Sequence, residues 1–219
     1  MKIIEVEDEP YSCIGISEET EKIKYIFTDK VYSNLEHLSI VSSLIDICLD
    51  FEGTKLNVPN LKHLDLEGIA SLQYFQNMND NFIFAPKLKE VYLIDTEVTQ
   101  LPAFIKNTKS LRSLQFRHGN LLEISNEIFE MEKLQKLSFE YCKKIRIVPD
   151  TIRKLINLVH FDLWEASIEY LSPELFLLPN IRSINLTYSE YTPTREVLDA
   201  LKIFKDKKQN RFEGFNTSH

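Results

Sequence analysis

Residues 134–163 of the chain read LQKLSFEYCKKIRIVPDTIRKLINLVHFDL. This stretch contains two triplets with the spacing apolar-x-x-apolar-x-apolar, namely Leu134-Leu137-Phe139 and Leu158-Phe161-Leu163. Between them lies a second apolar set, Ile145, Val148, Ile152 and Leu155. Alternation within a triplet predicts a short strand with one face turned inward. The second set then lines a return leg that leads to the next strand.

The same triplet recurs along most of the chain. Its seven copies are Leu35-Leu38-Ile40, Leu61-Leu64-Leu66, Leu88-Val91-Leu93, Leu111-Leu114-Phe116, Leu134-Leu137-Phe139, Leu158-Phe161-Leu163 and Ile181-Ile184-Leu186. The starts at 35, 61, 88, 111, 134, 158 and 181 are spaced by 26, 27, 23, 23, 24 and 23 residues. A fixed period of this length indicates a repeat architecture in which each unit buries its apolar face against its neighbours.

From about Leu35 to Phe204 this arrangement closely resembles the leucine-rich repeat family, in the variety that runs L-x-x-L-x-L-x-x-N-x-L-x-x-L-P-x-x-I-x-x-L. Pro102 and Pro149 follow Leu101 and Val148, as the L-P of that pattern requires. The resemblance implies an α/β solenoid. Its concave face would be a curved parallel β-sheet, and its convex side would hold irregular, 3-10 and short helical segments.

One departure from the family concerns its asparagine, whose amide normally links adjacent coils. The seven slots hold Ser43, Ile69, Thr96, Gly119, Cys142, Ala166 and Ser189. We therefore expect the usual hydrogen-bond ladder to be missing, or replaced by hydroxyls, the thiol and water. Around the first long repeats, the alternation from Ile45 to Phe51 predicts an extra strand, and residues 77–81 (NMNDN) predict a loop insertion.

Both ends of a repeat array expose apolar side chains and need a cap. Residues 1–34 carry three short apolar runs, which predict a β-rich N-terminal cap ahead of the repeats at 35–204. A capping helix is expected at 194–205, with Thr192 as N-cap and Pro193 in the first turn. Residues 206–219 form a basic tail, for which we expect loose order.

Composition narrows the function classes. The 219 residues carry 26 Lys and Arg against 33 Asp and Glu, a net charge of −7, which argues against nucleic acid as partner. No window approaches about 18 uninterrupted apolar residues, so no membrane span is expected, and the acidic N-terminus does not fit a signal peptide. Cys13, Cys48 and Cys142 are odd in number and widely spaced, which favours a reducing, cytoplasmic compartment.

Motifs for catalysis or cofactor binding do not occur in the sequence. It has five Gly and no glycine-rich phosphate loop, and it lacks G-x-S-x-G, H-E-x-x-H and C-x-x-C patterns. We therefore expect neither an enzyme nor a cofactor. A remote alternative is a metal-dependent enzyme, because His37, His63 and Glu90 share one column in three consecutive strands.

The outward residues of the predicted strands form columns on the concave face, about 4.8 Å apart from strand to strand. These columns hold six carboxylates, several aromatics and one arginine. The predicted partner-binding residues are Asp65, Glu67, Tyr92, Ile94, Asp95, Arg117, Glu140, Tyr141, Asp162, Trp164, Glu165 and Tyr188. The opposite, leading side carries Lys62, Lys89, Arg112, Lys136 and Arg182 against Glu36 and Glu90, so the face is predicted to be acidic along one edge and basic along the other.

Exposed aromatics rimmed by charge are typical of protein-binding hot spots. The sequence therefore predicts a non-enzymatic module, monomeric on its own, that binds a protein with a basic and apolar patch. Its role would be that of an adaptor, or of an inhibitor such as an immunity protein that blocks a toxin. The alternatives are a secreted effector that binds host proteins, and a Trp164 that merely packs over its neighbours. Arg117 and Glu140 are expected to form a cross-strand ion pair.

Overall fold

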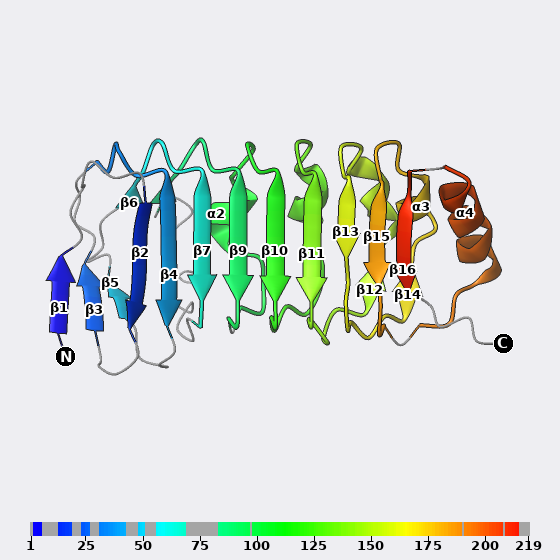
Figure 1. Cartoon of the computed structure of the whole chain (residues 1–219), viewed down its shortest axis with the longest axis horizontal. Coiled ribbons are helices and arrows are strands. Elements are labelled where there is room, and N and C mark those ends of the chain that lie inside the picture. Colours follow the sequence, from blue (N-terminus) through cyan, green and yellow to red (C-terminus); the bar gives the residue numbers. More distant parts are fainter. Residues whose placement is uncertain are drawn as a thin grey trace. The chain divides into compact units, whose positions relative to one another are not determined.

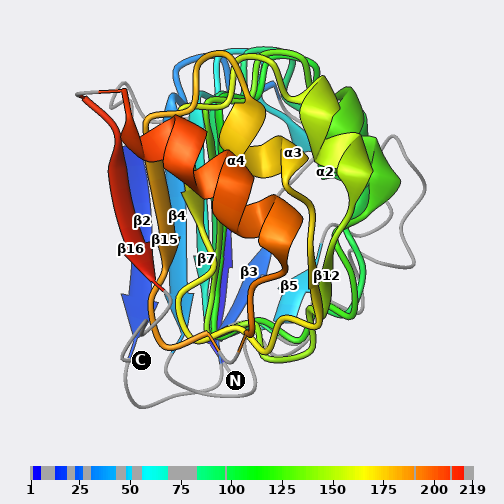
Figure 2. The ribbon, with the colours of Figure 1, turned by 90° about the vertical axis from the view of Figure 1, so that its right-hand side faces the viewer.

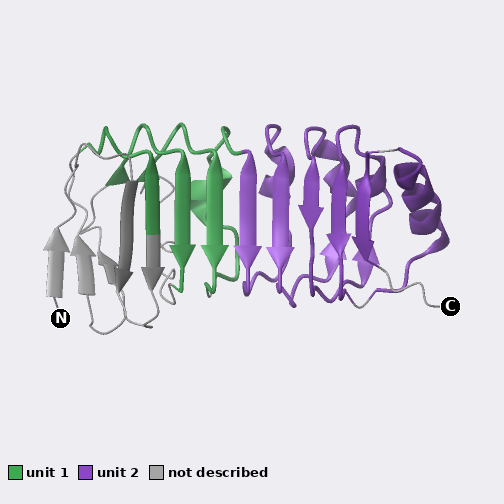
Figure 3. Ribbon diagram, viewed as in Figure 1, with its two compact units in different colours: residues 1–111 green, residues 112–219 purple. Residues whose placement is uncertain are grey.

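The computed structural model describes residues 2–5, 13–18, 23–26, 31–42, 48–50, 56–68, 83–96, 98–189, 191–207 and 209–214. The chain divides into two compact units, residues 1–111 (unit 1) and residues 112–219 (unit 2) (Figure 3). Each unit contains parallel strands from successive coils of the chain, so each is described separately below.

Unit 1 has a main parallel sheet with one strand from each coil (Figure 1). In spatial order its described strands are β9 (Glu90–Ile94), β7 (His63–Glu67), β4 (His37–Ser42) and β2 (Cys13–Glu18). Leu64 lies opposite Leu38 on one side and Val91 on the other. The triplets are therefore in register, as their phase in the sequence predicts.

The remaining described elements of unit 1 are short. A second parallel sheet consists of β1 (Lys2–Glu5), β3 (Ile23–Ile26) and β5 (Cys48–Asp50). On the return legs, β6 (Leu56–Asn57) pairs with β8 (Ile83–Phe84), and α2 (Ala103–Lys106) is a single helical turn. β1, β2 and β3 lie in the three apolar runs of the N-terminal segment, and β5 lies in the alternating run from Ile45 to Phe51. The loop insertion predicted at 77–81 and the slot residues Ser43 and Ile69 are outside the described residues.

Unit 2 repeats the same plan. Its main sheet runs in the order β16 (Arg211–Gly214), β15 (Ser183–Leu186), β13 (His160–Asp162), β11 (Lys136–Glu140) and β10 (Ser113–Arg117), with all neighbours parallel. The return legs contain the 3-10 helices η1 (Asn126–Glu130) and η2 (Asp150–Lys154), the helix α3 (Glu174–Leu177), and the paired strands β12 (Ile147–Val148) and β14 (Tyr170–Leu171). The predicted sheet with a 3-10 and short-helix return side is confirmed.

The core lies between the strands and the return legs. Leu137, Phe139 and Val148 are each 0% exposed, as the inward positions of both apolar sets require. The Phe139 ring stacks on Phe116 of the preceding coil, with centroids 5.5 Å apart and planes within 8°. Each fully buried side chain of this size contributes about 1.5–3 kcal/mol. The repeating ladder of such contacts stabilises one coil against the next.

A residue in the left-handed region follows β7, β9, β10, β11, β13 and β15, within three residues of the strand's end. These residues are Gly68, Asp95, His118, Tyr141, Glu165 and Tyr188, with φ between 50° and 67°. In unit 2, the backbone N–H groups of His118 and Tyr141 donate to the carbonyls of Glu140 and Trp164, at 2.9 and 2.8 Å. This conformation is uncommon for residues other than glycine. It turns the chain off the sheet, and it keeps these side chains at the end of the strands.

The family's asparagine slot directly follows the left-handed residue. Cys142 is 0% exposed, and its Sγ lies 4.0 Å from the Phe116 carbonyl oxygen and 3.6 Å from that of Glu140. Ser189 Oγ donates to the Leu163 carbonyl oxygen at 3.0 Å. Buried Thr96 Oγ1 has no hydrogen-bond partner among the described residues. A thiol and a hydroxyl therefore replace the amide at two slots, and the regular ladder does not form.

The C-terminal end of unit 2 is covered by α4 (Arg195–Lys205), which Figure 2 shows in front of α3. Its buried face includes Phe204, whose ring meets Phe176 edge-on at 6.1 Å. The N-cap is Thr194, whose Oγ1 accepts from the Val197 N–H at 3.4 Å. The prediction of Thr192 as N-cap was therefore wrong by two residues, because the first free N–H groups lie within reach of the later hydroxyl.

The prediction of a loosely ordered tail from residue 206 was also wrong in part, because β16 extends the main sheet. Phe212 pairs with Ile184 and its ring lies 6.0 Å from that of Phe176. Gly214 has φ 143°, and a Cβ there would lie 2.7 Å from the Cβ of Leu186. Only glycine fits this approach. The strand forms because the edge of β15 and the apolar cap offer it both hydrogen bonds and a buried contact.

Candidate functional site

The outer face of the unit 2 sheet carries the predicted columns in register. Gln115, Ser138, Asp162 and Asn185 lie side by side on β10, β11, β13 and β15, and Arg117 lies beside Glu140. Trp164 and Thr187 follow two residues after Asp162 and Asn185 along their own chain segments. Because side chains alternate along a strand, the strand residues among these are on the face opposite the core, although Ser138 is only 1% exposed. Trp164 and Thr187 lie beyond the strands and are partly exposed.

Four ring-bearing side chains lie in a line across this face. The His118 ring meets Tyr141 edge-on at 4.4 Å, Tyr141 lies 4.9 Å from Trp164, and Trp164 lies 6.5 Å from Tyr188. We call these four residues the aromatic row. His118, Tyr141 and Tyr188 occupy left-handed positions at the ends of three coils. Tyr188 is 69% exposed, whereas Tyr141 and Trp164 are partly buried against each other.

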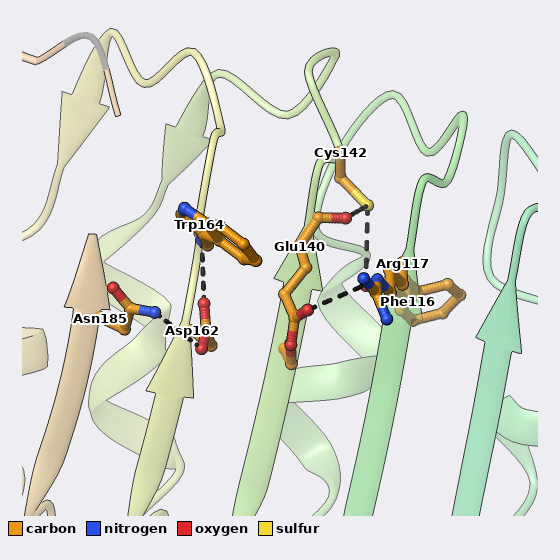
Figure 4. Close-up of polar contacts among 8 residues, drawn as sticks. Phe116, Arg117, Glu140, Cys142, Asp162, Trp164 and Asn185 are labelled. Atoms are coloured by element: carbon orange, nitrogen blue, oxygen red, sulfur yellow. Dashed lines mark hydrogen bonds and ion pairs between the residues drawn. The ribbon is translucent and has the colours of Figure 1, made fainter. Parts of the chain in front are cut away.

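Asp162 fixes the backbone that carries Trp164 (Figure 4). Its Oδ1 accepts from the Trp164 N–H at 2.9 Å, and its Oδ2 accepts from Asn185 Nδ2 at 3.1 Å. Asn185 does the same one coil later, where its Oδ1 accepts from the Thr187 N–H at 3.0 Å. Short Asp and Asn side chains commonly bond a backbone group two residues on. Here these bonds fix the backbone of the residues that directly follow β13 and β15.

Carboxylates surround the aromatic row. Glu140 lies 3.9 Å from Arg117 Nε, and Glu165 lies 3.9 Å from Lys143 Nζ. Both pairs are long and partly exposed, so each contributes little to stability. Burial raises the pKa of Asp162, and the neighbouring charge of Glu140 adds to this rise. Three carboxylates therefore lie around Trp164 and Tyr141, and the Arg117–Glu140 pair lies in the column where it was expected.

The side of the same sheet at which the strands begin is basic. Lys136, His160 and Arg211 belong to β11, β13 and β16, and Arg112 and Arg182 directly precede β10 and β15. All five are exposed. Although His160 is exposed, partial desolvation of its ring lowers its pKa, and the positive charges of Lys136 and Arg182 lower it further. We call these five residues the basic row. Arg211 was missed by the sequence because β16 was not predicted.

In unit 1, four of the predicted residues surround a shallow hollow of about 380 Å³. It is lined by His37, Ser39, His63, Asp65, Leu66, Glu67, Glu90, Tyr92 and Ile94. Burial raises the pKa of Asp65, against an opposing effect of the two histidines. Tyr92 donates its hydroxyl to Glu90 Oε2 at 3.2 Å. The fifth predicted residue of this unit, Asp95, is exposed at a left-handed position.

The column His37, His63 and Glu90 is also assembled as its register predicts. The two imidazole rings stack with centroids 4.0 Å apart, and His63 Nδ1 lies 3.1 Å from Glu90 Oε2. Among the described residues, however, no group of three or more His, Cys, Asp or Glu is arranged to hold a metal ion. The structure therefore lends no support to the metal-site alternative.

Comparison with solved structures agrees with the repeat pattern. InlP of Listeria monocytogenes matches at a TM-score of 0.52 with 17% identity, over 72% of this chain and 44% of that protein. The chain has the leucine-rich repeat fold. A leucine-rich repeat protein of Leptospira interrogans aligns at a TM-score of 0.42 and 16% identity, over 88% of this chain and 78% of that protein.

At the level of sequence, the match is narrower. The disease resistance protein RPS4B of Arabidopsis thaliana is 29% identical over 120 residues, which cover 47% of this chain. The chain spans only 10% of that protein's length, and 44% of InlP. No family model matches the chain. Among the helices of the described residues, none is long and apolar enough to cross a membrane.

Two residues of this leucine-rich repeat surface were missing from the predicted site. His118 continues the aromatic row, and Asn185 connects Asp162 to the segment that follows β15. The repeat alignment held a signal for His118, because it occupies the same position as Tyr141 and Tyr188. Asn185 gave no such signal, since its role depends on a contact with the preceding coil.

Proposed function

We propose that this leucine-rich repeat chain is a non-enzymatic module that binds a protein partner through the outer face of its sheet. The observation that carries the proposal is the aromatic row of unit 2, with Trp164 at its centre and Glu140, Asp162 and Glu165 around it. Repeat proteins of this type offer an extended face of this kind to partners. Asp65, Glu67, Tyr92, Ile94 and Asp95 of unit 1 are proposed to contribute to the same function.

Trp164 and Tyr141 have the properties of interface anchors. Their rings are large and are held by contacts with each other, so binding costs little further loss of side-chain freedom. Asp162 holds the backbone at Trp164, which keeps the ring in place before a partner arrives. Truncation of such an anchor commonly costs about 2 kcal/mol or more of binding free energy.

The partner is proposed to present a basic and apolar patch, because the surface around Trp164 carries three carboxylates and Arg117 is already beside Glu140. Two roles fit such a surface in a cytoplasmic protein. It could serve as an adaptor, or as an inhibitor that covers the active surface of another protein, as an immunity protein covers a toxin. Both roles need only tight binding and no catalytic group.

The test is a pull-down with mass spectrometry, followed by affinity measurements on the purified partner. Trp164→Ala and Tyr141→Ala are each expected to weaken binding by about thirtyfold or more. Tyr170→Ala is the matched control, since this tyrosine is 41% exposed on β14, outside the main sheet. Circular dichroism checks that each variant is folded. Unchanged affinity of both folded variants would remove the aromatic row from the proposed interface.

A further inference from the structure

The outer face of unit 2 is charged at both ends of its strands, and the proposed function uses only one end. Glu140, Asp162 and Glu165 lie around the aromatic row, whereas Lys136, His160 and Arg182 belong to the basic row at the start of the strands. Asp162 lies between the two, because it pairs with Ser138, which is midway between Lys136 and Glu140 on β11.

Three of the five side chains of the basic row have no polar partner among the described residues. Among the described residues, the side chains of Arg112, Lys136 and Arg182 take part in no ion pair or hydrogen bond. By contrast, Arg211 pairs with Glu213 of its own strand, and Lys143 reaches Glu165 at the other end of the sheet. Positive charges that lie near one another without an ion-pair partner favour an anion from outside.

We infer that the basic row is the second half of the binding surface and binds an acidic segment of the same protein partner. This inference rests on the proposed protein-binding function. The net charge of −7 disfavours a polyanion as large as a nucleic acid, because its many phosphates are repelled by the acidic parts of the protein. A short acidic segment contacts only the basic row, so it is attracted by these cations and is little repelled by the acidic residues elsewhere on the protein.

The fold also sets the spacing between the two charges of the partner. From Lys136 to Glu140, the two ends of β11, the chain advances four residues along a strand. This corresponds to about 13 Å. A partner segment that crosses the face must therefore separate its acidic and basic groups by about four residues if extended, or by about nine residues if helical.

Two labelled peptides of identical composition test the spacing. The block peptide EEEGSGRRR places its nearest opposite charges four residues apart, and the peptide ERERERGSG mixes them. The protein is expected to bind the block peptide about tenfold more tightly, measured by fluorescence anisotropy at low salt. The carboxylates of the bound block peptide are also expected to raise the pKa of His160, which an NMR titration measures. Equal affinities for the two peptides would overturn the inference.

Charge reversal locates the binding. Lys136→Glu with Arg182→Glu is expected to weaken the block peptide about tenfold. The matched control is Arg153→Glu with Lys202→Glu, which changes the net charge equally on η2 and α4, and it should have no such effect. An unchanged affinity after the first double reversal would refute the assignment of the basic row.

A single-stranded DNA oligonucleotide is the third probe. If it bound the basic row more tightly than the block peptide at the same salt concentration, the assignment to an acidic protein segment would be wrong. The inference and the proposed function fail separately. Loss of peptide binding in the Lys136 and Arg182 variant tests the basic row, whereas Trp164→Ala and Tyr141→Ala test the aromatic row with the captured partner.

Discussion

Gly119→Ala is expected to destabilise the protein, because the added methyl group meets the sulfur of Cys142. A Cβ at position 119 would lie 3.2 Å from Cys142 Sγ and 3.7 Å from Phe116 Cβ. The first distance is shorter than the usual 3.5–4.0 Å of a favourable contact. Cys142 is 0% exposed and packed between two coils, so its sulfur has little space to move.

The magnitude follows from two opposing effects. Overpacking a well-filled site costs about 1–3 kcal/mol. Replacing Gly by Ala also restricts the unfolded chain, which stabilises the folded state by about 0.4–1 kcal/mol where the backbone is compatible. Gly119 is not among the described residues with a positive φ, so an alanine is compatible with its backbone. We therefore expect a net loss of about 1 kcal/mol.

A double-mutant cycle isolates the contact. Cys142→Ala alone is expected to cost about 1 kcal/mol through the buried volume that it removes. In the double variant the two methyl groups share the space of the sulfur, so its cost should be smaller than the sum of the single costs by about 1 kcal/mol. Urea unfolding followed by circular dichroism measures all four proteins. Additive costs, or a stabilising Gly119→Ala, would show that the coil spacing at this slot is not as described.

Three further predictions concern single residues. Burial raises the pKa of the Cys142 thiol to about 11. Iodoacetamide at pH 8 should therefore leave Cys142 unmodified in the native protein and label it in urea, as measured by peptide mass spectrometry. Equal labelling in both states would contradict the burial of the thiol. Burial also raises the pKa of Asp162 above its ordinary 3.8. Its protonated carboxyl therefore stabilises the fold at low pH, and this contribution is lost as the pH rises through the folded pKa. Asp162→Asn should reduce the fall in the free energy of unfolding over that pH range, with the fluorescence of Trp164 as the probe of unfolding. An unchanged pH profile would count against the raised pKa. Thr194→Ala should cost about 1 kcal/mol of stability in urea unfolding, whereas Thr192→Ala should cost almost nothing, and the reverse order would restore Thr192 as the N-cap.

Much of the unit 2 surface could be predicted because strand geometry is local. Once Leu137 and Phe139 are assigned inward, Ser138 and Glu140 must point outward, and the repeat places Asp162 and Trp164 in the same columns. The contact between Tyr141 and Trp164 needed more than this. Tyr141 takes a left-handed backbone conformation, which no pattern of apolar residues specifies, and only that turn brings its ring within 4.9 Å of Trp164.

The sequence by itself determined the repeat, the parallel strands and the charge at each end of them, because a period of two along a strand and a fixed spacing between strands leave one arrangement that buries every triplet. Tertiary structure alone decided how the array ends and how its slots are filled. β16 has a single ring, Phe212, to bury, so it forms only where the edge of β15 and Phe176 are already in place. The Cys142 thiol likewise finds its carbonyl partner in the preceding coil. Such contacts join residues far apart in the chain, and their energies depend on packing that a local pattern does not contain.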